Sequence, residues 1–352
     1  MAFGAIDDES SSAEQHSAYP IWFLEFIDDR QTLKLSPHTI KAYRQDFLAI
    51  ASRLVPVPSE MLVSDIEKSG MRVAFATYAV DHEAASIRRC WSTWNVLCTF
   101  LFTSELIHAN PMPLIGRPKL AKSLPKALPP SSVEALVKNV GNQKVSPRKT
   151  DWNERDTAII LTAVLAGLRS EELRLLDVKD IRTISDGSAV LHVQGKGNME
   201  RAVPIEAGLL DVIRKYLESR RVRFPDSARS VARKAAADPL AGWKRSLPLF
   251  VGHDGERITR GTLQSRMRRA FNLAGPDAQR VPGALLHSLR HTYATELAKS
   301  DVSVYTLMKL LGHESMATSQ RYVTAAGTET REAAAQNPLY HLADADGETK
   351  PF

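Results

Sequence analysis

Six residues between positions 169 and 322 have side chains that could act together on one phosphate group: Arg169, Lys196, His287, Arg290, His313 and Tyr322. The set is almost entirely cationic or hydrogen-bond-donating, with a single phenol. Two arginines suit a phosphodiester because a guanidinium can donate to two phosphate oxygens at once. Fixed donors also stabilise the charge that develops on those oxygens in the transition state, where the loss of one donor typically costs ~3–4 kcal/mol.

Tyr322 is the candidate nucleophile of this set. A tyrosine oxygen can attack phosphorus and hold the product as a phosphotyrosine ester, but its ordinary pKa of about 10 requires a base or a cationic pocket. His287 is the candidate base, and Lys196 is the candidate acid for the leaving 5′ oxygen. The ester conserves the bond energy, so this chemistry needs no ATP, no metal and no other cofactor.

The sequence lacks the groups of residues that several other chemistries need. We find no carboxylate pair for glycosidic or metal chemistry, no Cys/His ligand cluster and no phosphate-binding glycine loop. Each of the six residues taken singly also has a common structural explanation. A lysine in a Gly-Lys-Gly turn is usually a turn residue, and a His-x-x-Arg pair usually lies on a surface or in a core. The hypothesis therefore depends on their joint order.

Hydrophobic spacing predicts the elements that carry the C-terminal members. A helix over 304–310 ends at Gly312 as a C-cap glycine would end it, and His313 follows on a loop. Tyr322 lies nine residues further on, in a short polar helix. Because its neighbours are polar, we expect a phenol presented to a cleft and not a core residue.

The other members fall on a broken helix, a hairpin and a further helix. Gly167 lies inside a helical region over 156–176 and predicts a break at Leu168-Arg169, because glycine costs ~1 kcal/mol within a helix. Alternation predicts strands over 189–194 and 201–205, with Lys196 in the turn. His287 and Arg290 share one face of a helix, and we expect His291, a step round the axis, to pack. A strand-like run at 249–251 and helices at 131–140, 209–217 and from Thr262 complete this part.

A helical unit precedes the linker. The pattern predicts about four helices after Pro20, among them 38–54, 71–80 and 84–105, with Ser36 as an N-cap. Prolines and lysines between 110 and 130 predict an extended basic linker, either along a phosphate backbone or as a solvated hinge. We expect a disordered tail over 1–18, a helical domain over 19–110, a linker over 111–130 and a second domain over 131–345.

Composition adds a charge bias. The 352 residues carry a net charge of +6, with eight Lys or Arg against two acids over 214–234 and five arginines without an acid over 257–269. Two runs of one sign beside the candidate site favour DNA phosphates as the partner. No apolar run reaches the ~20 residues of a membrane span. Cys90 and Cys98, if on one helix, are ~12 Å apart, too far for a disulfide, which favours a reducing, cytoplasmic setting.

In their order and spacing these motifs resemble the tyrosine recombinases, also called the phage integrase family. The likeness covers residues 20–340 and includes a first core-binding helix at Ser36–Arg44. The matching motifs are Ala166–Leu173 for the first arginine box, with Glu172 at its acidic supporting position, Lys196 for the hairpin lysine, His287–His291 for the His-x-x-Arg box, and Leu311–His313 with Arg321-Tyr322 for the third box and the nucleophile.

The resemblance implies a mainly α fold with a small β-sheet. A helical core-binding domain and a mixed α+β catalytic domain would close around double-stranded DNA as a C-shaped clamp. A homotetramer on two DNA sites, alone or with a related recombinase or accessory factor, would cut and rejoin strands through a 3′-phosphotyrosine and a Holliday junction. A helix over 328–335, with Leu339 and Tyr340, would dock on a neighbouring subunit. Candidate DNA contacts are Lys41, Arg44, Arg88 and Arg89.

Two features depart from the family pattern. Glu171 stands where the family has a small residue, and the segment 220–243 is longer than in minimal members. The N-terminal tail is too short for an arm-binding domain, which favours a Xer-like recombinase or a small integrase. Two alternatives stay open: a type IB topoisomerase-like nicking-closing enzyme, and a catalytically silent DNA-binding accessory protein.

Overall fold

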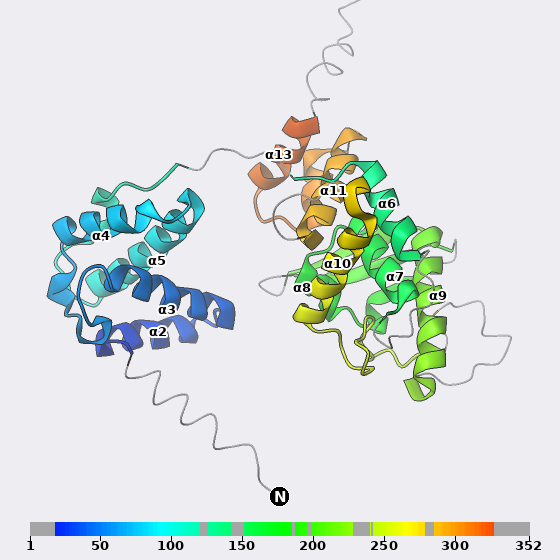
Figure 1. Cartoon of the computed structure of the whole chain (residues 1–352), viewed down its shortest axis with the longest axis horizontal. Helices are drawn as coiled ribbons and strands as arrows, with labels where there is room; N and C mark the ends of the chain where they lie inside the picture. The colour runs from blue at the N-terminus through cyan, green and yellow to red at the C-terminus, as the bar shows by residue number, and fades with distance from the viewer. Residues whose placement is uncertain are drawn as a thin grey trace, which may run out of the picture. The chain divides into compact units, whose positions relative to one another are not determined.

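The computed structural model describes residues 18–119, 126–141, 151–184, 187–195, 199–227, 240, 242–278, 285–300 and 302–326. The chain divides into two compact units, Met1–Lys122 and Ser123–Phe352 (Figure 1). Helices dominate both, and the predicted fold class, mainly α with a small sheet, is confirmed. Within the described residues, no helix is long and apolar enough to cross a membrane.

The first unit is helical, as predicted. Ser36 caps α3, its side chain accepting a hydrogen bond from the backbone N–H of Thr39 at 3.2 Å. The cap and the proline that follows it set the start of this helix one residue earlier than the prediction. The helices are α2 (Ile21–Thr32), α3 (Pro37–Ala51), α4 (Lys68–Val80) and α5 (Ala84–Thr103), with 3-10 turns at Pro58–Glu60, Val63–Asp65 and Met112–Leu114.

Aromatic rings and one buried carboxylate hold this unit together. The rings of Phe23 and Phe47 stack with their centroids 4.0 Å apart, and Trp94 stacks on Phe47 at 5.5 Å. Asp46 is fully buried beside them and accepts hydrogen bonds from α5 side chains, which ties α3 to α5. Met112, from the segment predicted as linker, is buried in the same core. Both cysteines are buried as free thiols, as their spacing predicted.

The second unit combines eight helices with a three-stranded antiparallel sheet in the order β1-β2-β3, counted over the described residues. The predicted hairpin is confirmed, with Leu191 opposite Val203 in its register. Its elements are α6 (Pro130–Gly141), α7 (Asn153–Leu165), α8 (Ser170–Leu175), β1 (Ile181–Thr183), β2 (Ala189–Gln194), β3 (Glu200–Ile205), α9 (Ala207–Arg223), α10 (Arg260–Ala274), α11 (Leu285–Lys299), α12 (Val304–Leu311) and α13 (Met316–Ala326).

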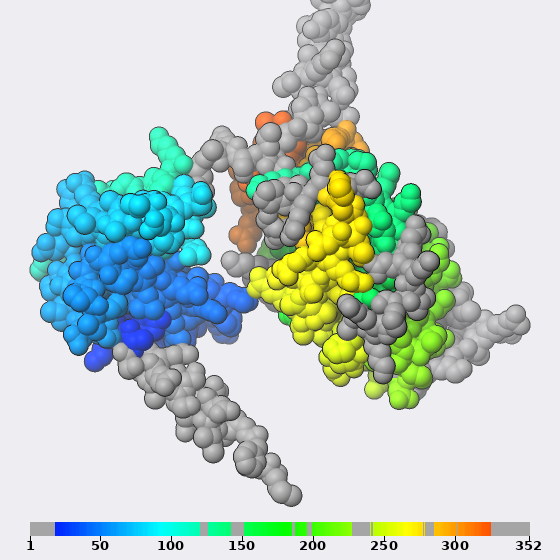
Figure 2. Space-filling view, viewed as in Figure 1, coloured from blue at the N-terminus to red at the C-terminus, as the bar shows by residue number. Residues whose placement is uncertain are grey.

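Three local predictions in this unit were wrong. The apolar run 249–251 is no strand: it lies buried and makes only isolated bridges, such as Val251 with Arg257. Helix α6 begins at Pro130, so Ser131 and Ser132 lie in its first turn and do not cap it. Helix α10 begins earlier than Thr262, because Thr259 is the cap. Figure 2 shows the side chains of α10, in yellow, as a ridge on the surface of this unit.

Gly167 makes the break between α7 and α8 that the sequence predicted. Its φ of 60° lies in the left-handed region, where glycine is favoured because it has no Cβ. The ring of Tyr293, on α11, packs against the same position, so that a Cβ at Gly167 would overlap it. The reversal places Arg169 at the N-cap position of α8, directly after the turn.

Gly167→Ala should therefore destabilise the second unit by about 2–4 kcal/mol, the sum expected for left-handed strain and for overpacking against Tyr293. Gly208→Ala is the matched control, because Gly208 lies in the first turn of α9 and a Cβ there meets nothing within 4 Å. Urea or thermal unfolding of the full chain measures both. Equal stability of the two variants would contradict the assigned strain.

Candidate active site

Arg169 is held by its neighbour in α8 and by a loop far along the chain. Its Nη1 donates to Oε1 of Glu172 at 2.8 Å, and its Nη2 donates to the carbonyl of Gly312 at 2.9 Å. The backbone N–H of Arg169 donates to Oε2 of Glu172 at 2.7 Å, so this carboxylate also caps the helix. The guanidinium is fixed in direction while its side chain keeps 38% of its surface exposed.

Arg290 reaches the same place from α11, and its side chain is almost fully buried. Its Nη1 donates to the carbonyl of Gly167 at 2.6 Å, and its Nη2 donates to the carbonyl of Leu311 at 2.5 Å. Burial, and after it the positive charge of Arg169, lowers the pKa of Arg290 to about 10, while Glu172 at 3.7 Å acts against this shift. Arg290 thus stays charged at neutral pH.

Arg201, on β3, is a member of this polar cluster that the sequence prediction missed. Its Nη1 and Nη2 donate to the two carboxylate oxygens of Glu172 at 2.8 and 2.7 Å, and its Nε donates to the carbonyl of Leu310 at 2.8 Å. A signal was present: Arg201 shares a strand face with Val203 and Ile205, which are both buried. A charged residue on a buried face needs a partner.

The C-terminal end of α12 connects these arginines. Helix ends leave carbonyls without partners in the helix, and they carry partial negative charge. The carbonyls of Leu310, Leu311 and Gly312 accept from Arg201, Arg290 and Arg169 respectively. Gly312 has φ 62° and ψ 51°, the left-handed cap that the sequence predicted. Three successive carbonyls therefore anchor the loop that carries His313.

Tyr322 lies on α13, as predicted, but the expectation of an open phenol was wrong. Only 4% of its surface is exposed, and it packs with Ala294, Leu307 and Leu311 in a small apolar cluster. Most of its polar neighbours in sequence are exposed, whereas Ser319, one turn earlier, is buried with Tyr322. Burial raises the pKa of the phenol, while the charges of Arg290, Arg321 and Arg169 act against the rise.

The two histidines nearest the phenol are His291 and His313. Nδ1 of His291 lies 2.7 Å from Oη of Tyr322, so the expectation that His291 only packs was wrong. The ring of His313 is nearly parallel to the phenol, with centroids 6.1 Å apart, and its Nδ1 is 2.9 Å from the hydroxyl of Ser319. Burial, followed by neighbouring cations, lowers the pKa of each histidine to about 4.

His287, the predicted base, lies one turn earlier on α11. Its ring meets the ring of His291 edge-on, with centroids 4.3 Å apart, and its side chain reaches the surface. Loss of solvent lowers its pKa, and Arg290 and Arg169 lower it further. Among the contacts that the structure describes, the hydrogen bond to Tyr322 comes from His291 and not from His287.

Lys196 lies outside the described residues, as do 228–239 of the long segment and the C-terminal residues 328–335, Leu339 and Tyr340. The described ends of the hairpin are closed, because the N–H of Gly195 donates to the carbonyl of Met199 at 2.7 Å. Five of the six predicted site residues are described, and the structure brings Arg169, Arg290, His287, His313 and Tyr322 into one region. In the parts of the chain that can be inspected, no group of three metal-ligating side chains occurs.

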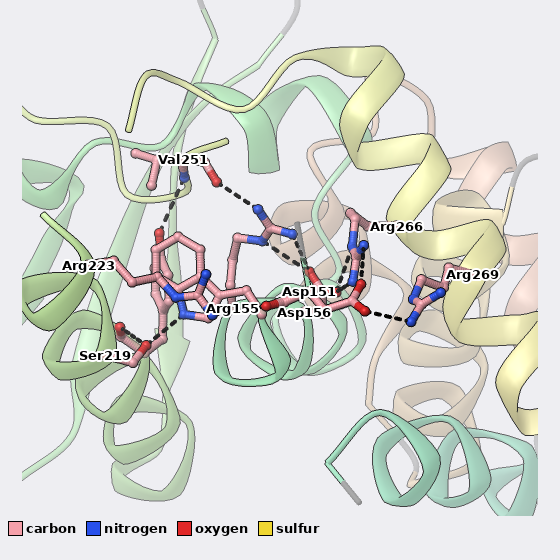
Figure 3. A network of polar contacts seen from close by, with 10 residues as sticks. Asp151, Arg155, Asp156, Ser219, Arg223, Val251, Arg266 and Arg269 are labelled. Atoms are coloured by element: carbon pink, nitrogen blue, oxygen red, sulfur yellow. Dashed lines mark hydrogen bonds and ion pairs between the residues drawn. The ribbon is translucent and has the colours of Figure 1, made fainter. Parts of the chain in front are cut away.

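The arginine run over 257–269 serves mainly internal partners, contrary to the expectation of DNA phosphates. Arg266 donates to Asp156 through Nε at 2.7 Å and to Asp151 at 3.2 Å, and Arg269 donates to Asp151 at 2.9 Å (Figure 3). Arg257 pairs with Asp177 at 2.5 Å. In the other basic run, Arg220 is buried and its guanidinium lies over the ring of Trp243, so this arginine also has an internal partner.

The candidate DNA contacts of the first unit differ in their surroundings. Arg89 donates through Nε and Nη2 to Asp46 at 3.0 and 2.7 Å, although its side chain is 56% exposed. Nη1 of Arg88 donates to the carbonyl of Pro118 at 3.0 Å. Lys41 projects from the exposed side of α3, while Arg44 is partly buried. Lys41 and Arg89 are therefore the exposed members of the four, and Arg89 is paired with Asp46.

Comparison with known proteins identifies the family of this chain. Residues 126–329 match the model of the Phage integrase family. The tyrosine recombinase XerC of Shewanella amazonensis is 30% identical over 318 residues, which cover 90% of this chain and 92% of that protein. The tyrosine recombinase XerC of Alcanivorax borkumensis is 29% identical over 82% of this chain and 84% of that protein.

Solved structures share the fold. The XerH site-specific recombinase in a post-cleavage complex with palindromic difH substrate has a TM-score of 0.66 and 21% identity, covering 85% of this chain and 79% of that chain. A lambda integrase tetramer bound to a Holliday junction has a TM-score of 0.62 and 18% identity, covering 90% and 81%.

Glu172 should make the stability of the second unit depend on acid pH. Burial alone would raise its pKa, but Arg201 and then Arg169 outweigh burial and hold the pKa at about 2, below the ordinary 4.5. The folded carboxylate thus contributes about 3 kcal/mol above pH 4.5, and this is lost as the pH falls from about 4.5 toward 2. The difference in unfolding free energy between wild type and Glu172→Gln should be largest at neutral pH and shrink over that window.

Glu171→Gln is the matched control for this measurement. The neighbouring carboxylate is 45% exposed and pairs with Arg174 at the surface, so its loss should change stability by less than about 0.5 kcal/mol. A Glu172→Gln difference that stays constant between pH 7 and pH 3 would contradict the buried ion pair.

Proposed function

The chain belongs to the phage integrase family, and we propose that it is a tyrosine-type site-specific recombinase that cuts and rejoins double-stranded DNA. One observation carries the proposal: two arginines from distant elements, Arg169 and Arg290, are anchored on the end of α12, directly before the loop that leads from His313 to the helix of Tyr322. The 30% identity with a XerC recombinase over 90% of the chain supports strand exchange over simple nicking and closing, because it includes the helical first unit.

The chemistry follows from the donors and the phenol. Arg169 and Arg290 each have five N–H groups, and their described contacts use two of them in each case, so both can donate further hydrogen bonds to a phosphate. In the proposed cleavage step, Oη of Tyr322 gives its proton to a histidine base and bonds to phosphorus, and the P–O5′ bond breaks. The strand is left as a 3′-phosphotyrosine, and the 5′ oxygen takes a proton from Lys196.

Rejoining is the reverse reaction with another strand. A 5′ hydroxyl gives its proton to Lys196 and attacks the phosphotyrosine, the P–Oη bond breaks, and the phenol oxygen regains its proton from the histidine base. Since the two esters have similar energies, the exchange needs no external energy source. The arginines stabilise the charge on the phosphate oxygens in both directions.

The proposed assembly is a homotetramer on two DNA sites, and its reaction passes through a Holliday junction. The proposed location is the cytoplasm. The lambda integrase tetramer on a Holliday junction, which shares the fold, supports this assembly. The helical domain expected over 19–110, which lies within the first unit, is proposed as the core-binding domain, with Lys41, Arg44, Arg88 and Arg89 toward DNA. The catalytic domain is proposed over 131–345, after a linker over 111–130.

Tyr322→Phe should abolish covalent protein–DNA adducts and leave DNA affinity within about twofold, because only the attacking oxygen is lost. The substrate is a nicked duplex carrying the site that footprinting identifies, and adducts are counted on denaturing gels. Tyr305→Phe is the matched control, because this tyrosine on α12 is 54% exposed and should keep full adduct formation. Adducts that persist in Tyr322→Phe would rule out Tyr322 as the nucleophile.

Binding to duplex DNA should weaken steeply with salt, because each phosphate contact releases a counterion. Lys41→Ala should weaken binding and reduce the slope of log K against log salt by about 1 if this side chain meets a phosphate. Lys68→Ala, at an exposed lysine that begins α4, is the control and should leave the slope unchanged. Fluorescence anisotropy across a salt series measures both. Affinity that does not vary with salt would contradict a phosphate interface.

A further inference from the structure

The phenol oxygen of Tyr322 meets a histidine outside the six expected site residues. Nδ1 of His291 is 2.7 Å from Oη, and the two ring centroids are 5.6 Å apart. His291 lies on α11 directly after Arg290, and Tyr322 lies on α13, a helix packed against α11. The contact thus joins the attacking atom to the helix that carries the phosphate-binding arginine.

We propose that His291, and not His287, accepts the proton of Tyr322 when the phenol attacks phosphorus. The inference rests on the proposed function. In the step, the Oη–H bond breaks and its proton moves to Nδ1 of His291, while Oη forms the bond to phosphorus and the P–O5′ bond breaks. On rejoining, His291 returns the proton to the phenol oxygen. His291 is therefore a catalytic residue in direct contact with a reacting atom.

The positive charges around His291 keep its ring neutral, so that the ring can accept a proton. On α11 it neighbours His287 and Arg290, Arg321 comes from α13, and Lys126 comes from the segment before α6. Burial, together with the positive charge of these groups, lowers the pKa of His291 to about 4. A neutral imidazole has one nitrogen lone pair, so with its proton on Nε2 the ring accepts from the phenol O–H. A protonated ring could not do so.

Binding of DNA would raise the pKa of His291 and so make it a stronger base in the complex. Arg290, which lowers the pKa of His291, is also one of the two proposed phosphate ligands. Bringing a phosphate onto Arg169 and Arg290 adds negative charge near the ring and raises the pKa of His291 toward the range where it holds a proton. The base is thus weak in the unbound protein and stronger in the complex.

His287 is placed for a different partner. It lies one helical turn before His291, its ring touches that of His291 edge-on, and its side chain is exposed. It shares a helix face with Arg290, whose guanidinium lies among the proposed phosphate ligands. From this position His287 can donate to a phosphate oxygen while His291 serves the phenol.

The test is single-turnover cleavage of the nicked site by the full chain over a range of pH. His291→Phe and His291→Asn should each slow adduct formation at pH 7 by about 10²–10⁴-fold, the usual contribution of a general base. Asparagine keeps an acceptor near the position of Nδ1 but cannot take the proton. Both variants should gain about tenfold in rate per pH unit in the alkaline range, as the phenolate forms without help, whereas the wild type should vary less.

A substrate with sulfur in place of the leaving 5′ oxygen separates the two proton transfers. Sulfur leaves without a proton donor, so it bypasses a defect in the acid but not one in the base. The His291 defect should persist on this substrate. A defect that disappears there would assign His291 to the leaving group and overturn the proposal.

His253→Phe is the matched control, because this histidine is exposed in the same unit and the variant should cleave at the wild-type rate. Thermal unfolding checks that each variant folds, and His291→Asn serves if His291→Phe does not. Wild-type rates in His291→Asn, faster cleavage, or a defect that is equal at all pH values would each overturn the assignment. A wild-type chain that forms no adduct on any duplex would instead overturn the proposed function itself.

Discussion

The carboxylate of Glu172 is the interaction on which the polar centre of the second unit depends. It is buried, accepts from both Arg169 and Arg201, and lies 3.7 Å from Arg290. Three guanidiniums this close would repel one another without an acid between them. Removing one partner from a buried ion pair lowers stability by about 3–5 kcal/mol, because it leaves an uncompensated charge. Glu172 therefore fixes the convergence of α8, β3 and α11.

The C-terminal end of α12 connects these three arginines to the segment that carries His313 and Tyr322. Its last carbonyls, from Leu310 to Gly312, accept from the three arginines, so the loop that follows has a fixed origin. His313 begins this loop, and α13 leads from it to Tyr322, whose phenol is buried against α11 and α12. One helix end thus sets the distance between the proposed phosphate ligands and the proposed nucleophile. The left-handed turn at Gly167, whose carbonyl binds Arg290, fixes the other side.

Local signals in the sequence predicted most of the elements and five described members of the site region. Gly167 and Gly312 marked real turns because their left-handed backbone conformations favour glycine. The alternation of apolar and polar residues located the hairpin. What could not be predicted depends on partners far apart in sequence. Three of the five arginines over 257–269 pair with Asp151, Asp156 and Asp177, and no window of the chain reveals such pairs. The contact of His291 with Tyr322 is of the same kind.

The most direct measurement is peptide mapping by mass spectrometry of the covalent complex trapped on a nicked duplex. The account predicts that the 3′ phosphate of the cut strand is attached to the peptide that contains Tyr322, and to that residue within it. Attachment of the strand to any other residue, such as Tyr293 beside Gly167, would contradict the proposed geometry of attack.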